Sequence, residues 1–410
     1  METARSSFIS EPTKSALKQR LHFVEWLFVY LLRDLKHGSL HLHFPSGASR
    51  ILGDRTRPLV MMRICRASFF KKLFSSGGVG LGESYVDGDW ETNDLTSLLT
   101  VLAKNQKDLG RMRLGFSFLA RKFNRIYHKA RSNTVEQCVS NIQEHYDLSN
   151  AFYETFLDPT MTYSSALFTD PKQSLESAQR AKMDRMLDLA GVKKGDSILE
   201  IGSGWGALAQ SAAERGCTVR TVTLSLEQFA YAQNRFVAAE IEDAVSIELL
   251  DYRNIEGQYD AVISCEMIEA VGHEYLESYF AKIRDSLKPG AKAVLQAITI
   301  PDERYEHYCG SCDWIQKHIF PGGHLPSPGA IRDQVAQAGD MNVNAMLSFG
   351  HDYAETLKRW AESFNAASKK ITELGFDDTF KRKWNYYLSY CGAGFATDLI
   401  DVQHVVIERS

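Results

Sequence analysis

The stretch Ile198-Leu-Glu-Ile-Gly-Ser-Gly-Trp-Gly-Ala-Leu-Ala209 decides the fold of this chain of 410 residues. A short apolar run leads into glycines at alternate positions, Gly202, Gly204 and Gly206, and a helix-like run follows. Glycine adopts unusual backbone dihedral angles and lets a ligand come close, because it has no Cβ. A helix that begins after such a turn presents unpaired N–H groups. The stretch therefore predicts a strand, a tight ligand-binding turn and a helix.

An acidic residue, Glu200, lies at the end of this first strand. A carboxylate there suits a cationic, amine-bearing cofactor better than a pyrophosphate, whose negative charge it would repel. We therefore interpret the turn as a site for S-adenosylmethionine rather than NAD. A dinucleotide enzyme would also carry an acid at the end of the next strand, 219–224, whereas this chain offers Thr223 and Gln228. Gln228 also fits a capping box that begins at Ser225, so both roles stay open.

Two further strands are predicted beyond this point. The strand at 245–250 ends in Asp251-Tyr252, and both residues can approach an adenine edge. The strand at 259–264 ends in Cys265-Glu-Met-Ile-Glu269. Ligands bind at the carboxyl ends of strands in open α/β sheets. We expect an α/β, Rossmann-like methyltransferase domain in which strands and helices alternate to about residue 300, followed by a C-terminal helical addition from about residue 328.

Composition narrows the class of protein. The chain is 44% hydrophobic and 24% charged, with a net charge of −4, which is ordinary for a globular protein and argues against nucleic-acid binding. We see no secretory signal, and the longest apolar run, 26–32, is far shorter than the roughly 20 residues that span a bilayer. The seven cysteines follow no disulfide framework, which favours a reduced, cytoplasmic protein.

One cysteine pair, Cys309-Gly-Ser-Cys312, has metal-ligand spacing, with His307 and His318 nearby. No second pair completes a zinc site, and no thioredoxin-like context surrounds the motif. We therefore expect incidental cysteines and no metal site.

The chain is predicted to divide into an N-terminal domain, 1–135, and a methyltransferase domain, 136–410. Residues 110–135 carry seven basic side chains and no acidic one, with aromatic and aliphatic residues between them. A basic amphipathic helix can lie on an anionic membrane, each cation adding about 1 kcal/mol near the surface. A solvated basic helix packed on its own domain explains the pattern equally well.

Taken together, the motifs resemble those of the cyclopropane fatty acid synthases and related lipid methyltransferases, and the resemblance covers most of the chain. It rests on His145-Tyr-Asp-Leu-Ser-Asn150, Leu157-Asp-Pro-Thr-Met-Thr-Tyr-Ser-Ser-Ala166, Glu200-Ile-Gly-Ser-Gly-Trp-Gly206, Thr223-Leu-Ser-Leu-Glu-Gln228, Met267-Ile-Glu-Ala-Val-Gly272, Ile319-Phe-Pro-Gly-Gly-His-Leu-Pro-Ser327, Phe349-Gly-His-Asp-Tyr353 and Tyr386-Tyr-Leu-Ser-Tyr-Cys-Gly-Ala-Gly-Phe395. The stretch Gly80-Leu-Gly-Glu-Ser-Tyr-Val-Asp-Gly-Asp-Trp90 resembles the N-terminal lipid-facing domain of that family.

The resemblance implies a methyl transfer from S-adenosylmethionine to the cis double bond of an acyl chain in membrane phospholipid. It implies an enzyme at the inner face of the membrane, with the small N-terminal domain reaching the bilayer, and a possible homodimer. The positions that match the family's cofactor-binding residues are Tyr163, Ser164, Gly202, Gly204, Thr223, Gln228 and Asp251.

The family holds a bicarbonate base between two cysteines, a glutamate, a histidine and a tyrosine. Glu269, Tyr353 and Cys391 match three of these positions, whereas Ser165 replaces the first cysteine and Gln296 replaces the histidine. Ser and Gln still donate hydrogen bonds, but neither carries the positive charge of a histidine. We expect Glu269 to be the central carboxylate and Tyr353 to orient the anion or a substrate cation.

These replacements leave several outcomes open. The altered site can still bind bicarbonate and form a cyclopropane, can give a methyl-branched or methylene chain, or can use another base, such as Glu269, to desaturate a methylated chain. Methylation of a small soluble metabolite and non-catalytic binding of lipid or cofactor are the alternatives outside lipid methylation.

Overall fold

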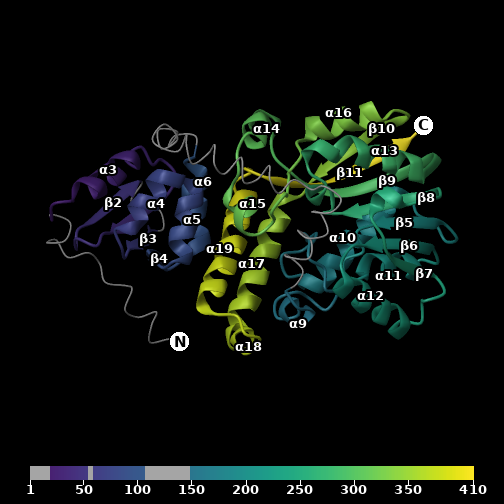
Figure 1. The fold of residues 1–410 in the computed structure, drawn as a ribbon, viewed down its shortest axis with the longest axis horizontal. Helices are drawn as coiled ribbons and strands as arrows, with labels where there is room; N and C mark the ends of the chain where they lie inside the picture. The colour runs from purple at the N-terminus through teal and green to yellow at the C-terminus, as the bar shows by residue number, and fades with distance from the viewer. Residues whose placement is uncertain (1–18, 54–58, 107–147) are drawn as a thin grey trace. The chain divides into compact units, whose positions relative to one another are not determined.

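The computed structural model describes residues 19–53, 59–106 and 148–410, which form two compact units (Figure 1). Unit 1 contains the described residues up to 106 together with 312–314 and 376–397. Unit 2 contains residues 148–311, 315–375 and 398–410. The predicted division at 135/136 and the basic segment 110–135 lie outside the described residues, so both stay predictions.

Unit 2 is built on a seven-stranded sheet with the order β10-β11-β9-β8-β5-β6-β7. The pairs that join β9, β8, β5, β6 and β7 are parallel, and β11 is antiparallel to both β9 and β10. The four strands predicted from the sequence are confirmed as β5, β6, β7 and β8. The strands are β5 (Ser197–Ile201), β6 (Thr218–Thr223), β7 (Val245–Leu249), β8 (Tyr259–Cys265), β9 (Leu287–Thr299), β10 (Met341–Ser348) and β11 (Asp401–Arg409).

Helices cover both faces of this sheet, because neighbouring strand residues point in opposite directions. Ile198 packs with α10, α11 and α12, whereas Leu199 packs on the other face with α13 and α16 (Figure 1). This two-sided burial confirms the Rossmann-like α/β class. The covering helices are α10 (Leu175–Ala190), α11 (Ala207–Glu214), α12 (Leu226–Ala238), α13 (Leu276–Ser286) and α16 (Pro328–Ala338).

The segment after residue 328 contains the expected helices and also β10 and β11, which the sequence analysis missed. In β11, Val402 and Val405 to Ile407 are buried, so the strand reads as an apolar run without alternation. Such a run cannot be told from a buried helix by periodicity. The remaining elements of unit 2 are α9 (Asn150–Tyr153), η3 (Tyr252–Asn254), η4 (Ile268–Ala270), η5 (His273–Tyr275), α14 (Asp302–Cys309), α17 (Gly350–Ala366) and α18 (Ser368–Glu373), while α15 (Trp314–His318) begins in unit 1.

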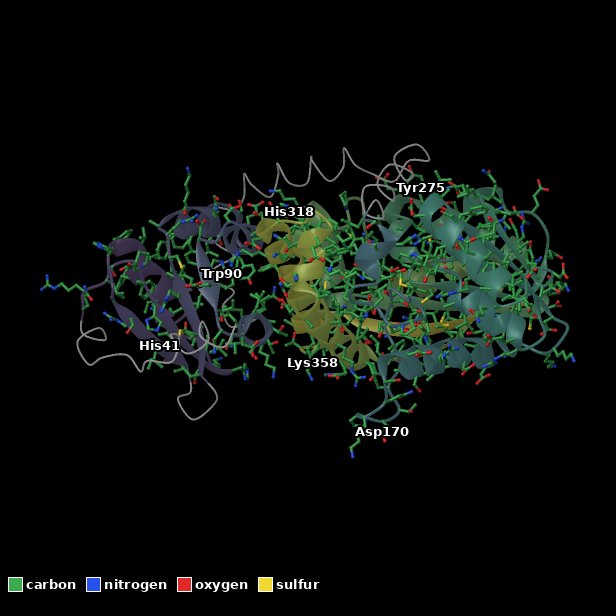
Figure 2. All side chains as sticks on the ribbon, turned by 90° about the horizontal axis from the view of Figure 1, so that it is seen from below. His41, Trp90, Asp170, Tyr275, His318 and Lys358 are labelled. Carbon is green, nitrogen blue, oxygen red and sulfur yellow. The ribbon has the colours of Figure 1, made fainter. Side chains whose placement is uncertain are left out.

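Unit 1 contains a four-stranded sheet with the order β2-β1-β3-β4. Helix α19 belongs to this unit although it follows in sequence by almost three hundred residues. Thr96 Oγ1 lies 2.9 Å from Ser389 Oγ, and Arg382 donates to the carbonyl of fully buried Trp90 at 3.0 Å. Trp90 is labelled in Figure 2. The elements are α3 (Phe23–Leu31), β1 (Ser39–His43), β2 (Ser49–Gly53), β3 (Leu59–Ile64), α4 (Ser68–Ser76), α5 (Gly78–Val86), β4 (Trp90–Thr92), α6 (Leu95–Lys104) and α19 (Asp378–Phe395). None of the described helices has the length and apolar content needed to cross a membrane.

Gly206, where α11 begins, provides a test of the packing of unit 2. Its φ is +87°, and an added Cβ would lie 2.8 Å from the ring of Phe236. Gly191, at the end of α10, has a φ of +71° and open space around it. We expect Gly191→Ala to lower the free energy of unfolding by about 1–2 kcal/mol, and Gly206→Ala by a further 1–3 kcal/mol or so because of overpacking. Urea denaturation measures both, and equal losses would contradict this packing.

Candidate active site

The glycine turn after β5 has the backbone conformation that the sequence predicts. Gly202, Gly204 and Gly206 have φ values of +93°, +48° and +87°, in the region that favours glycine. A Cβ on Gly202 would lie 3.1 Å from Met267 Cγ, whereas a Cβ on Gly204 would enter open space. The turn therefore leaves room for a ligand beside the carboxyl ends of the strands.

A pocket lies at this edge of the sheet, and most of the predicted cofactor residues line it. They are Tyr163, Ser164, Glu200, Gly202, Gly204, Thr223, Gln228 and Tyr252. Asp251 does not line it, because its carboxylate accepts hydrogen bonds from the backbone and the side chain of Arg253, each at 2.9 Å. The structure confirms the helix cap at Gln228, whose backbone N–H is capped by Ser225. Its side chain lines the pocket, where it accepts a hydrogen bond from Thr223, and its contact with a cofactor stays a prediction.

The segment 160–166 forms one wall of the pocket and is held from three helices. Gln179 of α10 donates to the carbonyl of Ser164 at 2.8 Å, and Arg235 of α12 donates to the carbonyl of Thr160 at 2.8 Å. The backbone N–H of Ala166 bonds to Thr356 of α17 at 3.1 Å. A short polar segment thus gains a fixed shape from neighbours that are distant in the sequence.

Lys182, which the sequence analysis did not identify, adds a buried cation to this pocket. It is 1% exposed, and its Nζ donates to Ser164 Oγ at 2.7 Å. The pattern gave little indication of it, because one lysine on an amphipathic helix is usually solvated.

Glu200 is buried at the pocket wall, where Thr221 donates to its carboxylate at 2.6 Å. Burial raises the pKa of Glu200 to about 8, against the opposing effect of the Thr221 hydrogen bond. Ser203 Oγ and Tyr252 Oη are buried in the same wall, and Ser203 Oγ has no hydrogen-bond partner among the described residues. A nearby cation would favour the ionised form of Glu200. Together with the polar atoms of this wall, Glu200 therefore fits the amino and ribose groups of S-adenosylmethionine.

Glu266, at the end of β8, is the carboxylate that meets the predicted anion-binding residues. Its Oε1 accepts from the backbone N–H of Ser165 at 2.9 Å and from Gln296 Nε2 at 2.7 Å. Its Oε2 accepts from the hydroxyl of Tyr353 at 2.8 Å. Burial raises the pKa of Glu266, and these three hydrogen bonds and Lys182 oppose the rise. A side-chain carboxylate therefore occupies the donors that the sequence analysis assigned to bicarbonate.

The backbone at Glu266 is also unusual. Its φ is +49°, and Met161, which also lines the pocket, has a φ of +56°. Non-glycine residues in this region cost about 1–3 kcal/mol each and cluster at functional sites. The strained backbone at the end of β8 is therefore a second indication, independent of its hydrogen bonds, that Glu266 is a functional residue.

His404 on β11 orients the Gln296 amide. His404 Nε2 lies 3.0 Å from Gln296 Oε1. Burial, with the charges of Arg185 and Lys182, lowers the pKa of His404 to about 3, so the imidazole is neutral. Since an amide oxygen only accepts, His404 donates to it, and the amide NH₂ is thereby directed at Glu266.

Glu269, the predicted central carboxylate, lies beside this arrangement rather than within it. Its Oε1 accepts from the backbone N–H of Ile298 at 2.6 Å, and its Oε2 is buried without a hydrogen-bond partner in the part of the chain that the structure describes. Burial, followed by the charge of Glu266, raises the pKa of Glu269 to about 8. A carboxyl group with this pKa carries a proton at neutral pH.

The remaining predicted residues differ in what they contribute. Ser165 acts through its backbone N–H, because its hydroxyl bonds to the carbonyl of Ala166 at 2.9 Å. The side chains of Gln296 and Tyr353 both donate to Glu266, and their predicted roles in the reaction stay predictions. Cys391 lies on α19 in unit 1, and its membership of the site stays a prediction.

Glu200 and Glu269 predict a pH-dependent stability. Each binds a proton in the folded protein up to about pH 8 but loses it near pH 4.5 when unfolded. The free energy of unfolding is therefore expected to fall as the pH rises from 5 to 8, by at most about 1.4 kcal/mol per pH unit for each group. Urea denaturation at several pH values measures this slope. Glu200→Gln and Glu269→Gln should each reduce it, while Glu277→Gln, an exposed control, should not. A slope that neither buried variant changes would contradict the assignment.

Comparison with known proteins identifies the family of the chain. The family model described as mycolic acid cyclopropane synthetase matches residues 133–405. Tuberculostearic acid methyltransferase UfaA1 of Mycobacterium tuberculosis is 41% identical over 387 residues, covering 92% of this chain and 90% of that protein. Cyclopropane-fatty-acyl-phospholipid synthase of Escherichia coli is 36% identical over 360 residues, covering 85% and 87%.

A solved structure gives the same family. The mycolic acid cyclopropane synthase CmaA1, in complex with SAH and CTAB, superposes with a TM-score of 0.62 at 30% identity. The match covers 66% of this chain and 98% of that one. The glycine turn, the pocket and these matches together show that the chain belongs to the mycolic acid cyclopropane synthetase family and is an S-adenosylmethionine-dependent methyltransferase.

Proposed function

We propose that this enzyme methylates the double bond of an unsaturated acyl chain in phospholipid, with Glu266 as the base that completes the reaction. The observation that carries the proposal is the Glu266 carboxylate, which lines the cofactor pocket and holds three hydrogen bonds. The product is a chain with a cyclopropane ring or a methylene branch.

The chemistry requires a base at this position. S-adenosylmethionine supplies the methyl group, and its transfer to one alkene carbon leaves a carbocation on the acyl chain. Loss of a proton from the new methyl group frees an electron pair that closes the ring or, after a hydride shift, forms a methylene double bond. Glu266 accepts that proton. Its fixed carboxylate needs no rotation and no recruited anion.

The two neighbouring glutamates have different roles in this proposal. Glu266 receives three hydrogen bonds that favour the ionised form, whereas Glu269 receives one and keeps a proton. When two carboxyl groups lie in environments that give them different pKa values, the ionised group can act as a base while the protonated group stays neutral. Glu269 supports the base electrostatically by remaining neutral, because a second negative charge would raise the pKa of Glu266 further.

Phospholipid is the proposed carrier of the acyl chain, and the membrane surface is the proposed partner. The E. coli relative is named for fatty-acyl phospholipid. Helix α3 also exposes an aromatic row, with Phe23 73%, Trp26 50% and Tyr30 41% exposed. Their rings lie 6.2 and 5.4 Å apart along one face of the helix. Aromatic side chains of this kind favour the interface between lipid and water.

The proposal is tested with S-adenosylmethionine that carries a labelled methyl group and vesicles of unsaturated phospholipid. Mass spectrometry of the fatty acids should find label on the acyl chain, and its fragmentation identifies a ring or a branch. We expect Glu266→Gln to lower kcat by about 10²–10⁴-fold. Cofactor affinity should stay close to that of the wild type, because the amide keeps the shape of the side chain.

Glu269→Gln is the matched variant three residues away. It should lower kcat at pH 7 by less than about tenfold, since Glu269 is already protonated and its amide can still accept from Ile298. A larger loss of kcat in Glu269→Gln than in Glu266→Gln would identify Glu269 as the base. Absence of label from every unsaturated phospholipid would refute the lipid methylation itself.

Adding bicarbonate distinguishes a base that is a side chain of the protein from a base that is a bound bicarbonate ion. The wild type should turn over at the same rate with and without it, because Glu266 occupies the three donors. Glu266→Ala leaves these donors unpaired beside a vacant volume, so bicarbonate should restore part of its activity, whereas Glu266→Gln should show no rescue. Activity of the wild type that depends on bicarbonate would contradict the proposal.

A further inference from the structure

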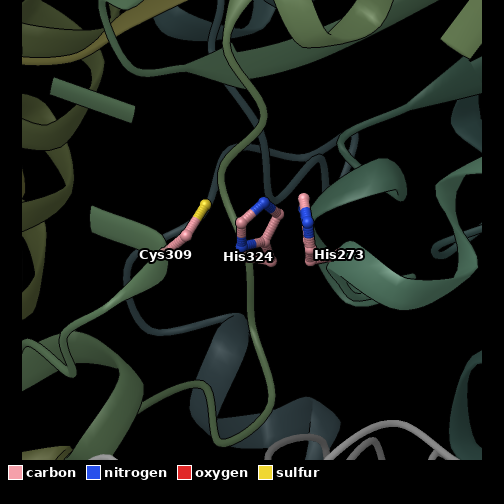
Figure 3. Close-up of side chains that lie close together, drawn as sticks. All are labelled: His273, Cys309 and His324. Carbon is pink, nitrogen blue, oxygen red and sulfur yellow. The ribbon is translucent and has the colours of Figure 1, made fainter. Parts of the chain in front are cut away.

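Cys309, the first cysteine of the Cys309-Gly-Ser-Cys312 motif, lies near two histidines that the sequence did not indicate. Cys309, His273 and His324 each offer a ligand atom, and the three atoms lie within 4.8 Å of one another. Figure 3 shows the imidazole of His324 between Cys309 and His273. The nearby residues first considered, His307, His318 and Cys312, are not part of this group. All three members of the group belong to unit 2.

Tyr305 holds the two imidazoles in place. Its hydroxyl lies 3.0 Å from His273 Nδ1 and 2.9 Å from His324 Nε2. A hydroxyl can donate to one ring nitrogen and accept from the other, so both rings are oriented by one atom. Tyr305 and Cys309 are four residues apart on α14, which puts them on one face of the helix. Oxygen, sulfur and two nitrogens therefore converge from three segments.

We propose that His273, Cys309 and His324 bind a zinc ion, with the Tyr305 hydroxyl as an outer-shell partner or fourth ligand. Two imidazoles and one thiolate form a set of ligands that binds zinc more strongly than it binds harder divalent cations. Zinc takes nitrogen at about 2.0–2.1 Å and sulfur at about 2.3 Å, so the ligand atoms must approach one another by about an ångström.

The positions of the three side chains permit this movement. His324 is 5% exposed and is held by its neighbours, so it provides the fixed ligand. His273 and Cys309 are exposed, and their side chains can turn toward the ion by rotation about χ1 and χ2. Binding requires the thiolate, so Cys309 releases its proton as the sulfur–zinc bond forms.

The ion would join three segments that surround the catalytic strand ends. His273 lies in η5 after β8, Cys309 ends α14 after β9, and His324 lies in the loop before α16. The backbone N–H of His324 donates to the carbonyl of Glu269 at 2.8 Å. A zinc ion there would serve as a structural cross-link next to the active site, and its binding does not depend on the substrate or product of the enzyme.

The metal alone tests this site on the full-length protein. After treatment with a chelator, the protein is titrated with Co²⁺, whose absorption reports tetrahedral geometry and, through a charge-transfer band, thiolate ligation. We expect one Co²⁺ per chain with a thiolate band, displaced by one equivalent of Zn²⁺. Competition with a zinc-binding dye then measures the affinity.

Variants assign the ligands. Cys309→Ser should abolish the thiolate band, and His273→Gln and His324→Gln should each weaken zinc binding by at least about 100-fold, more than loss of an outer-shell partner. Cys312→Ser and His307→Gln are the matched controls in the same stretch and should stay within about threefold of the wild type. A spectrum without a thiolate band, or equal losses in Cys312→Ser and Cys309→Ser, would overturn the proposal. Because His273 and Cys309 are exposed, their variants retain the fold and keep the test decisive.

Discussion

A carboxylate taken out of water must be met by donors, and this constraint organises the active site around Glu266. Its partners come from the segment 160–166, from β9 and from α17, and His404 of β11 orients one of them. Each of these elements must be in register for the carboxylate to be satisfied. The strained backbone of Glu266 is tolerated because these contacts overdetermine its position.

The same constraint supports the proposal that Glu266 is the base of this site. The donors that would hold an anion remain, but a side chain of the protein now occupies them. Ser165 and Gln296 suit this arrangement, because a neutral donor can meet a carboxylate without adding a positive charge. The second glutamate, Glu269, accepts from the N–H of Ile298, and burial keeps it protonated.

The fold could be predicted from the sequence wherever local signals were strong. The strands β5 to β8 each end in a turn or a polar residue, and the glycine turn needs dihedral angles that only glycine adopts easily. β11 was missed because a strand buried on both faces has no alternation to detect. The sequence also did not predict that α19 packs in unit 1, since contacts between distant segments produce no periodic pattern in the sequence.

The sequence by itself determined the α/β class and the glycine turn, because these follow from backbone preference and from spacing along the chain. The candidate site residues came from the resemblance to the family. Only the tertiary structure decided which of two glutamates meets the donors. Glu266 and Glu269 are three residues apart and have the same chemistry, and the packing of β9 and α17 against β8 distinguishes them. His273, Cys309 and His324 likewise became neighbours only through folding, since proximity in space depends on the path of the chain between them.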